Sequence, residues 1–450
     1  MSPNPPQRPP GVVFWFRSDL RLHDQLALAH AVQRAQALGG WLLPVYVQDP
    51  TQGAITRWGF ERTGAHRQAW LQAQLQDLAE QLAQLNNPLQ ILTGTPAQVL
   101  ADLVGQLGHP HLVCEHIAAP YELRDVQDLR QRAVQVHTVW QSSLLDPAHL
   151  PFGLAQLPDT FTVFRQAIEA AGVQAPPPLP APAQLPPPPS ACAAVQFRLA
   201  VRQPLEQPPA PSQWPDDRRS AFPCQDPPFQ GGERAALAHV QRYCQRGLPH
   251  TYKATRNGLI GVDYSSKWSP WLATGALSAR QAWAAIAAFE QAHGATESTY
   301  WLWFELLWRD HFRFLHHKHG ARLYRAGGLS HRPTPAHKPE AFDRWREGRT
   351  GNAWIDAGMR ELAATGYLSN RMRQNVASYL IHDLGCDWRA GAAWFEARLL
   401  DYDVYSNQGN WLYLSGGGTD PRGSRRFNPE KQARDHDPHG TYRQLWAPSA

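Results

Sequence analysis

Short apolar runs and longer helical patterns alternate along the first third of the chain. The apolar runs have the length and unbroken hydrophobicity of buried parallel strands, and they lie at residues 12–16, 41–47, 89–92, 111–114 and 136–139. Hydrophobic positions at helical spacing fill the intervals, at residues 24–38, 63–85 and 96–107 and once more before residue 136. This order predicts a doubly wound α/β domain with a parallel sheet over residues 11–140.

The first helix carries signals at both ends. We expect Asp24 to cap its start and Gly39 to end it. No Gly-x-Gly-x-x-Gly follows the first strand, so we do not expect a dinucleotide cofactor in this domain.

Residues 141–230 differ in composition from the domain before them. Prolines crowd residues 176–189, and because proline lacks an amide hydrogen these positions cannot form helix or interior strand. Polyproline II is the expected local structure and would make a stiff connector. A motif for a proline-binding partner is an alternative, but we interpret the region as a linker between domains.

Residues 231–450 read as helical to the end. Ser269 and Pro270 are a suitable N-cap and first turn, and Ser278 with Gln281 forms a capping box for a helix that Gly294 ends. Helices are predicted near residues 269–274, 278–294, 297–317, 354–364, 369–384 and 389–400. The predicted fold is therefore a doubly wound α/β parallel-sheet N-terminal domain followed by an all-α C-terminal domain.

The composition is that of a globular protein. Of the 450 residues, 43% are hydrophobic and 18% charged, and no run of apolar residues is long enough to span a membrane. The first residues lack the apolar core of a signal peptide, and the five cysteines show no metal spacing, so we expect a reduced, cytoplasmic setting. The net charge of +5 permits a nucleic-acid partner without proving one, and the 18 tryptophans favour stacking or electron transfer.

Residues 401–413 concentrate acids, amides, a glycine and aromatic side chains directly after an apolar helical run. This combination is typical either of a capped helix junction or of a polar floor with aromatic walls that holds a flat heteroaromatic cofactor. Residues 265–269 place hydroxyls and the Lys267 ammonium before a helix start, which suits a pyrophosphate, although an ordinary Ser-Pro cap is the alternative.

Several blocks, in one order along the chain, resemble the photolyase and cryptochrome family, most closely its DASH-type cryptochromes. They lie at residues 12–22, 252–280, 301–314, 365–375 and 401–413. The resemblance implies an antenna-binding domain at 11–140, a linker at 141–230 and an FAD- and DNA-binding domain at 231–450. It also implies electron donation from light-excited reduced FAD to a cyclobutane pyrimidine dimer in DNA.

The resemblance assigns a set of FAD contacts. Arg373 and Asp401 are expected as a charge pair beside the isoalloxazine, Asp403 on the ribose or adenine side, and Asn407 facing flavin N5. The remaining cofactor positions are Tyr252, Ser265, Ser266, Lys267, Trp268 and Ser269.

The same resemblance outlines a substrate pocket and a DNA surface. Glu305 and Trp308 share one helix face, as do Asn370 and Gln374, and together they would receive a dimer that has left the DNA stack. Candidate phosphate contacts are Arg256, Arg309, Arg371 and Lys431.

Trp411 and Trp388 match the first two members of the family's electron relay. The third place is Pro335, which cannot serve, so photoreduction must either leave through another aromatic residue or run poorly. The alternatives considered are Tyr413, Trp345 and Trp354.

The resemblance also implies a light-harvesting antenna, often a folate such as 5,10-methenyltetrahydrofolate, and DASH-type relatives usually place a glutamate near the end of the fourth strand. Here Ile117 stands at that place, and Glu115 is a possible substitute. The expected function is repair of pyrimidine dimers in DNA, preferably single-stranded, by a monomer. The alternative is a blue-light photoreceptor that binds FAD and DNA without significant repair. Repair of (6-4) photoproducts is not favoured, because the histidine pair of that subfamily is missing from the matching places.

Overall fold

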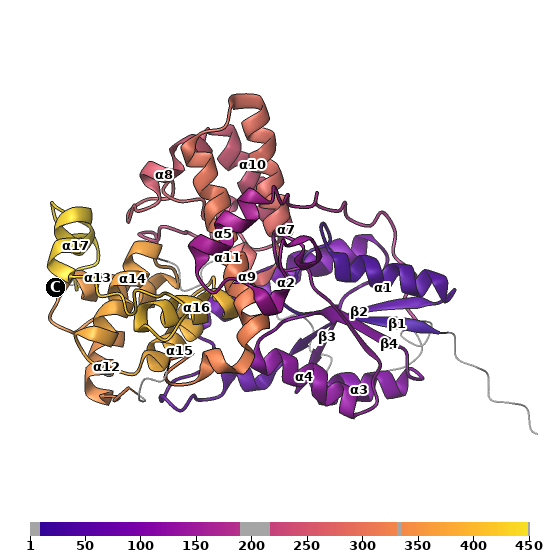
Figure 1. The fold of residues 1–450 in the computed structure, drawn as a ribbon. Coiled ribbons are helices and arrows are strands. Elements are labelled where there is room, and N and C mark those ends of the chain that lie inside the picture. Colours follow the sequence, from indigo (N-terminus) through magenta and orange to yellow (C-terminus); the bar gives the residue numbers. More distant parts are fainter. Residues whose placement is uncertain (1–9, 190–216, 331–334, 449–450) are drawn as a thin grey trace, which may run out of the picture.

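A five-stranded parallel sheet forms the core of the N-terminal part of the chain (Figure 1). The structure is a computed structural model that describes residues 10–189, 217–330 and 335–448. The strands are β1 (Gly11–Phe16), β2 (Trp41–Gln48), β3 (Gln90–Thr93), β4 (His111–Glu115) and β5 (Val136–Val139). They are ordered β3-β2-β1-β4-β5, so the predicted doubly wound sheet is confirmed.

Four helices cover the two faces of this sheet. They are α1 (Leu26–Ala37), α2 (Ala65–Gln84), α3 (Pro96–Gln106) and α4 (Pro120–Gln131). The side chains of Val12, Phe14 and Phe16 pack with α1 and α2, whereas Val13 and Trp15 pack with α3 and α4. Because β1 is buried on both sides, its sequence is continuously apolar rather than alternating.

The predicted capping role of Asp24 is wrong. Gln25 occupies the N-cap of α1 and makes no side-chain capping bond. Asp24 instead has a φ of 52° and forms a buried ion pair of 2.9 Å with Arg280 of the helical part. A long-range charge partner therefore outweighs the local capping preference and joins the two halves of the molecule.

The segment between the two parts contains a helix that the sequence did not predict. This helix, α5 (Phe161–Ala170), buries Phe161, Phe164 and Ile168 and packs against the long helix α11. Residues 176–189 form neither helix nor strand, as predicted. The middle of the expected linker, 190–216, lies outside the described residues.

The C-terminal part is helical, and no strand occurs in it among the described residues after 216. Its helices are α7 (Glu233–Gln245), α8 (Tyr252–Thr255), α9 (Ser269–Thr274), α10 (Ala279–His293), α11 (Glu297–His319), α12 (Pro339–Arg346), α13 (Ala353–Thr365), α14 (Asn370–His382), α15 (Trp388–Arg398), α16 (Val404–Ser415), α17 (Pro429–His436) and α18 (Thr441–Leu445). Across the described ranges, no helix has the length and apolar character needed to cross a membrane.

Two of the predicted helix starts have different outcomes. The capping box of Ser278 and Gln281 is present, and its helix ends at Gly294 as predicted. Ser269 is not an N-cap, because Trp268 holds that position and no side chain caps α9. The amides at the start of α9 are consequently not satisfied by a side-chain cap.

Candidate functional site

A cavity of about 520 Å³ lies between α8, α11, α14, α16 and the loop before α9. Its size is within the roughly 300–1,000 Å³ common for small-molecule and cofactor sites. Most of the site residues predicted from the sequence line it: Tyr252, Arg256, Ser265, Ser266, Lys267, Trp268, Ser269, Glu305, Trp308, Arg309, Asn370, Arg371, Arg373, Gln374 and Asp401. The structure thus brings together residues from four separate stretches of the chain.

A smaller cavity of about 80 Å³ adjoins it and shares Asn370, Arg373, Gln374 and Asp401. Three further predicted residues line this second space: Asp403, Asn407 and Trp411. Trp388 and Lys431 line neither cavity.

The loop before α9 has a strained backbone. Ser265 and Lys267 adopt φ values of 61° and 60°, which non-glycine residues rarely do. Lys267 in this left-handed conformation is followed by Trp268 in the right-handed one, and such a pair turns successive N–H groups toward one side, forming a nest for an anion. The loop leads directly into the N-terminus of α9, where the helix dipole favours negative charge.

Lys267 is more deeply buried than its sequence context suggests. It is 2% exposed, and its Nζ has no hydrogen-bond partner among the described residues. The ammonium lies 3.1 Å from the centre of the Tyr264 ring, and burial holds its pKa well below the usual range. Because an unpaired buried ammonium is costly, this group fits an anionic partner.

Arg373 and Asp401 form the predicted charge pair, with Nη2 and Oδ2 2.8 Å apart. Arg373 is fixed further by donating from Nε to the carbonyl oxygen of Leu368. Burial alone would lower the pKa of Arg373, but the Asp401 carboxylate outweighs it and raises the pKa. The second oxygen of Asp401, Oδ1, is buried without a partner among the described residues, so it is available to an N–H group of a ligand.

Asp403 has a partner that the sequence analysis missed. Its carboxylate caps α16 by accepting from the Ser406 amide and pairs with Arg313 at 2.5 Å. Burial opposes ionisation of Asp403, but Arg313, together with Arg309, lowers its pKa to about 2. Arg313 follows Glu305 and Arg309 at intervals of four on α11, and this spacing could have indicated that all three share one helix face.

The predicted substrate wall is assembled at the cavity. Trp308 stacks on Phe161 with ring centres 3.7 Å apart, and its other contacts include Tyr413 at 6.2 Å. Glu305 forms an ion pair with Arg256, whose guanidinium lies 4.0 Å from the Trp301 ring. Burial raises the pKa of Glu305 above its usual value.

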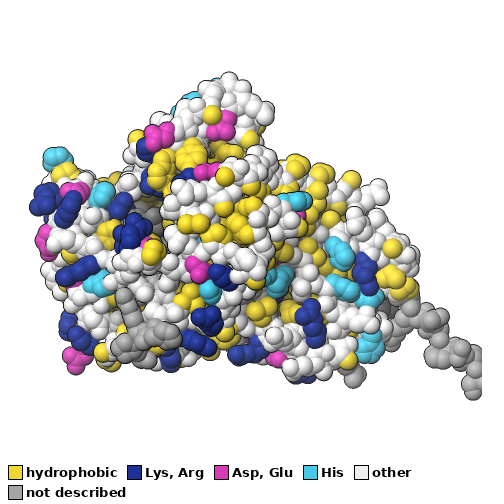
Figure 2. Space-filling model, viewed as in Figure 1, with side chains coloured by type: hydrophobic (Ala, Val, Ile, Leu, Met, Phe, Trp, Pro, Cys, Tyr) yellow, Lys and Arg dark blue, Asp and Glu magenta, His cyan; other side chains and the backbone are white. Residues whose placement is uncertain are grey.

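The four predicted DNA contacts have three different placements. Arg256 and Arg371 lie at the cavity, whereas Lys431 is exposed on α17 and pairs with Asp435 at 2.5 Å. Figure 2 shows lysine and arginine side chains spread over the C-terminal helices. Arg309 donates to the carbonyl oxygens of Ser142 and Leu272, a placement that gives no support to a phosphate contact.

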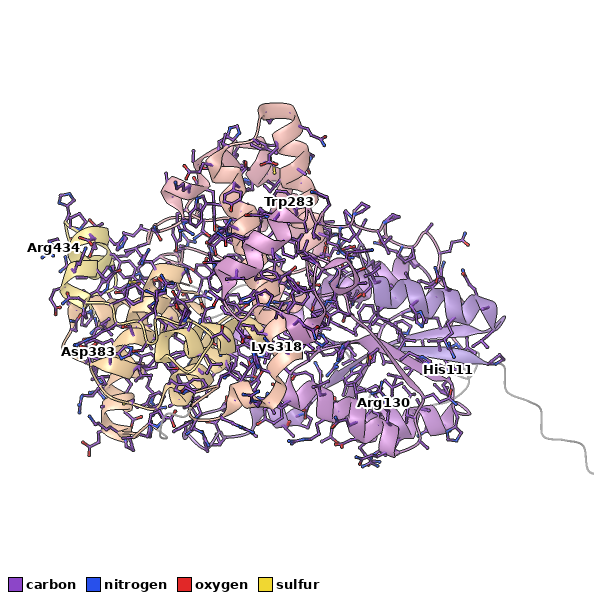
Figure 3. All side chains as sticks on the ribbon, in the orientation of Figure 1. His111, Arg130, Trp283, Lys318, Asp383 and Arg434 are labelled. Carbon is purple, nitrogen blue, oxygen red and sulfur yellow. The ribbon has the colours of Figure 1, made fainter. Side chains whose placement is uncertain are left out.

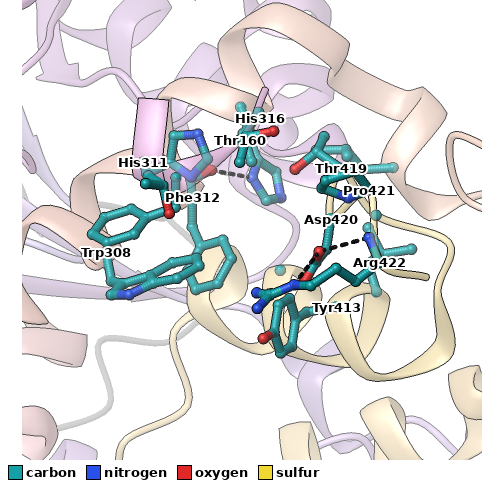
Figure 4. Close-up of a pocket in the computed structure, with 17 residues that line it drawn as sticks. Thr160, Trp308, His311, Phe312, His316, Tyr413, Thr419, Asp420, Pro421 and Arg422 are labelled. Atoms are coloured by element: carbon teal, nitrogen blue, oxygen red, sulfur yellow. Dashed lines mark hydrogen bonds and ion pairs between the residues drawn. The ribbon is translucent and has the colours of Figure 1, made fainter. Parts of the chain in front are cut away.

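Trp308 and Tyr413 also border a separate cavity of about 210 Å³ (Figure 4). Asp420 and Arg422, which are hydrogen-bonded to each other, lie beside Tyr413 and across the cavity from Trp308. Phe161 of α5 contributes to its wall. Because α5 was read as linker, the sequence analysis missed this space.

A further cavity of about 150 Å³ lies where the two parts of the molecule meet, at the carboxyl ends of β1, β2 and β4. Strand order reverses between β1 and β4, which is where α/β sheets bind ligands. Glu115 and Ile117 both line it. Burial, with a smaller effect of Asp19, raises the pKa of Glu115 to about 8, and its Oε2 is without a partner among the described residues. Within the described ranges, no group of three or more metal-ligating side chains is placed to hold a metal ion.

Comparison with protein families matches residues 12–183 to the family DNA photolyase and residues 301–450 to the FAD binding domain of DNA photolyase. The cryptochrome DASH of Synechocystis is 43% identical, and the alignment covers 98% of this chain and 88% of that protein. The cryptochrome DASH of Xenopus laevis is 42% identical, and the alignment covers 97% of this chain and 82% of that protein. Among solved structures, a Synechocystis cryptochrome superposes with a TM-score of 0.88 at 42% identity, covering 98% of this chain and 89% of the other. A class III photolyase from Agrobacterium tumefaciens superposes with a TM-score of 0.75 at 27% identity, covering 99% of this chain and 88% of the other.

Proposed function

The chain belongs to the photolyase and cryptochrome family, within its DASH branch, and on that premise we propose that it is a light-driven lyase that splits cyclobutane pyrimidine dimers in DNA. The observation that carries the proposal is one cavity that combines an unpaired buried lysine amino group, an unpaired carboxylate oxygen and an aromatic wall. The first two groups suit a flavin nucleotide, and the wall suits extruded bases.

The residues of this cavity fit FAD, for which the chain contains a binding domain. Bound FAD supplies one-electron chemistry driven by light. Lys267 and the amides of the loop 265–269 would hold the pyrophosphate. Oδ1 of Asp401 would accept from the flat ring system while Arg373 keeps the carboxylate ionised and in place.

Asn407 is proposed to face flavin N5. Its Nδ2 donates to the carbonyl oxygen of Ala392 at 3.1 Å, which fixes the orientation of the amide. A neutral amide next to N5 adds no repulsion toward a reduced, negatively charged ring. The residue therefore favours repair over signalling chemistry.

The substrate would enter beside this site. Phe161 covers one face of Trp308, so a base can stack only on the other face. Glu305 and Asn370 provide hydrogen-bonding groups for base edges, and Arg256 and Arg371 provide charge for the flanking phosphates. Single-stranded DNA is the preferred substrate, because a lesion in it does not have to leave a duplex. The protein is proposed to act as a monomer in the cytoplasm.

The second candidate is a blue-light photoreceptor that binds FAD and DNA without repair. It is favoured by the name cryptochrome, which the curated relatives carry. The two candidates differ in one observable, because only the lyase restores intact pyrimidines.

A light-harvesting folate is proposed for the cavity between the two parts. Ile117 offers it no hydrogen bond, whereas Glu115 presents an unpaired carboxyl oxygen. With a pKa of about 8, Glu115 is largely protonated at neutral pH and can donate from that carboxyl group. Loss of a near-ultraviolet absorption band in Glu115→Ala, with FAD retained, would support this site.

The proposed function is tested by anaerobic blue-light irradiation of thymine-dimer oligonucleotides with reduced protein. We expect repair of the single strand and slower repair of the same lesion in a duplex. Flavin-loaded protein that binds the single strand but repairs neither substrate would overturn the lyase in favour of the photoreceptor.

A further inference from the structure

A column of aromatic rings begins at Trp411, in the wall of the smaller cavity. The Trp411 ring lies 5.1 Å from Phe395 of α15, and Phe395 lies 6.4 Å from Trp345 of α12 with the two planes 21° apart. Trp345 in turn stacks on Phe342 at 5.8 Å. Figure 1 shows α12, α15 and α16 gathered in the same part of the molecule.

The column continues to the protein surface through the N-terminal part of the chain. The Phe342 ring lies 5.5 Å from His337, which lies 4.7 Å from Trp58. Trp411 and Trp345 are 1% and 0% exposed, whereas Trp58 is only half-buried. Ring contacts therefore run without a break from the cavity wall to solvent.

The loop that carries Trp58 is held against α15. An isolated bridge between Ile55 and Glu61 closes the loop. The next residue, Arg62, pairs with Glu396 of α15 at 2.7 Å, and the Gly64 amide donates to the carbonyl oxygen of Ala397. These contacts keep the Trp58 ring in its place at the end of the column.

The column has one side branch, in which Phe342 contacts Phe60 at 6.1 Å and Phe60 contacts Trp394, an indole that is buried and does not reach solvent. Among the described residues, the other candidate relay residues share no ring contact with Trp411. Trp388 donates its indole N–H to the carbonyl oxygen of Ala326 and forms no ring pair among the described residues. Tyr413 contacts Trp308 and the Arg425 guanidinium. The remaining alternative, Trp354, packs on Tyr442 and donates its indole N–H to Asn375.

We infer that Trp411, Trp345 and Trp58 form this chain's electron path between the cofactor cavity and solvent, with Trp58 taking the role for which Pro335 is unsuited. The inference rests on the proposed FAD site. Trp411 gives one electron to the light-excited, oxidised cofactor, Trp345 refills Trp411, and Trp58 refills Trp345. The Trp58 radical cation then releases its indole proton to water. A small thiol in solution restores the indole by donating a hydrogen atom, and two oxidised thiols combine as a disulfide.

The intervening rings shorten the gaps without being oxidised, because phenylalanine and imidazole hold their electrons more tightly than indole. Arg57 lies 4.4 Å over the Trp58 ring and disfavours a positive charge there. This guanidinium is exposed, so water and salt screen it, and proton release removes the charge altogether. Loss of the indole proton at the protein surface is therefore the step that prevents the electron from returning to Trp58.

The experiment compares flavin-loaded Trp58→Phe, Trp345→Phe and the control Trp283→Phe by time-resolved absorption and electron paramagnetic resonance of tryptophan radicals. Trp283 is a half-buried indole on α10 that pairs with Trp303 of α11, and Figure 3 shows it far from Asp383 of the C-terminal helices. Flavin content is measured first in every sample.

We expect Trp58→Phe to shorten the lifetime of the radical by at least tenfold while leaving the initial yield intact, and Trp345→Phe to lower the yield itself. The control should match the unaltered protein. An unchanged lifetime in flavin-loaded Trp58→Phe would overturn the path, even if Trp345→Phe failed to fold. A folded protein without any flavin would overturn both the path and the proposed function.

Discussion

Replacement of Asp401 by alanine removes one member of the charge pair in the cavity. The carboxylate is 1% exposed and the Arg373 side chain 23% exposed, so the guanidinium that remains is largely cut off from water. Breaking a buried pair by removing one partner costs about 3–5 kcal/mol. Because Arg373 keeps its bond to Leu368 and some contact with solvent, we expect a cost at the lower end of this range, so that the free energy of unfolding falls by about 3 kcal/mol.

The same change removes the unpaired Oδ1 that we assign to the flavin ring. A hydrogen bond to a charged group contributes about 1.5–3 kcal/mol, so flavin affinity should fall roughly 10- to 100-fold. Flavin titration of refolded protein measures the affinity, and denaturant unfolding without flavin measures the stability.

Two controls separate the causes. Asp401→Asn keeps an acceptor oxygen and should retain more affinity than the alanine variant. Asp435→Ala breaks the exposed pair with Lys431 and should cost no more than about 1 kcal/mol. Flavin affinity that is the same in Asp401→Ala and the unaltered protein would refute the assignment of this carboxylate to the cofactor.

Three further predictions concern the cofactor loop and the DNA surface. Burial holds the pKa of Lys267 well below its usual range, and a bound pyrophosphate would raise that pKa, so flavin binding takes up a proton. Flavin affinity should therefore fall as the pH rises above the lowered pKa of the free protein. Lys267→Met should flatten this pH dependence in flavin titrations at several pH values. Arg371→Gln should reduce the salt dependence of single-strand binding by about 0.7 in the slope of log K against log salt, and an unchanged slope would remove Arg371 from the phosphate contacts. Trp308→Ala should weaken binding of dimer-containing DNA by about 1–3 kcal/mol in a fluorescence anisotropy assay, whereas Trp283→Ala should not.

The sequence predicted those features of the fold that neighbouring residues determine. The five strands were found because each is a short apolar run, and the capping box of Ser278 and Gln281 was found because both partners lie within one turn. Asp24 has the same local capping preference, but its carboxylate pairs with Arg280, 256 residues away along the chain. The helix α5 was missed because the prolines around it indicated a linker, although Phe161, Phe164 and Ile168 lie at helical spacing and form its buried face.

The candidate site shows the same limit. The pairing of Arg373 with Asp401 was predicted through the family resemblance, and the structure shows it. The pairing of Asp403 with Arg313 was not predicted, because nothing along the chain relates these two residues. Nor does the sequence show that the Lys267 ammonium is buried on an aromatic ring, because burial depends on how Tyr264 and the helices around it pack.

We propose that one cavity holds the cofactor and the lesion close enough for direct electron transfer. The decisive experiment is the fluorescence lifetime of the reduced, flavin-loaded protein, measured with saturating undamaged or dimer-containing single strands of one sequence. We expect a shorter lifetime with the dimer strand, and no such shortening with the undamaged strand. Equal lifetimes with both strands, when anisotropy shows both to be bound, would contradict it.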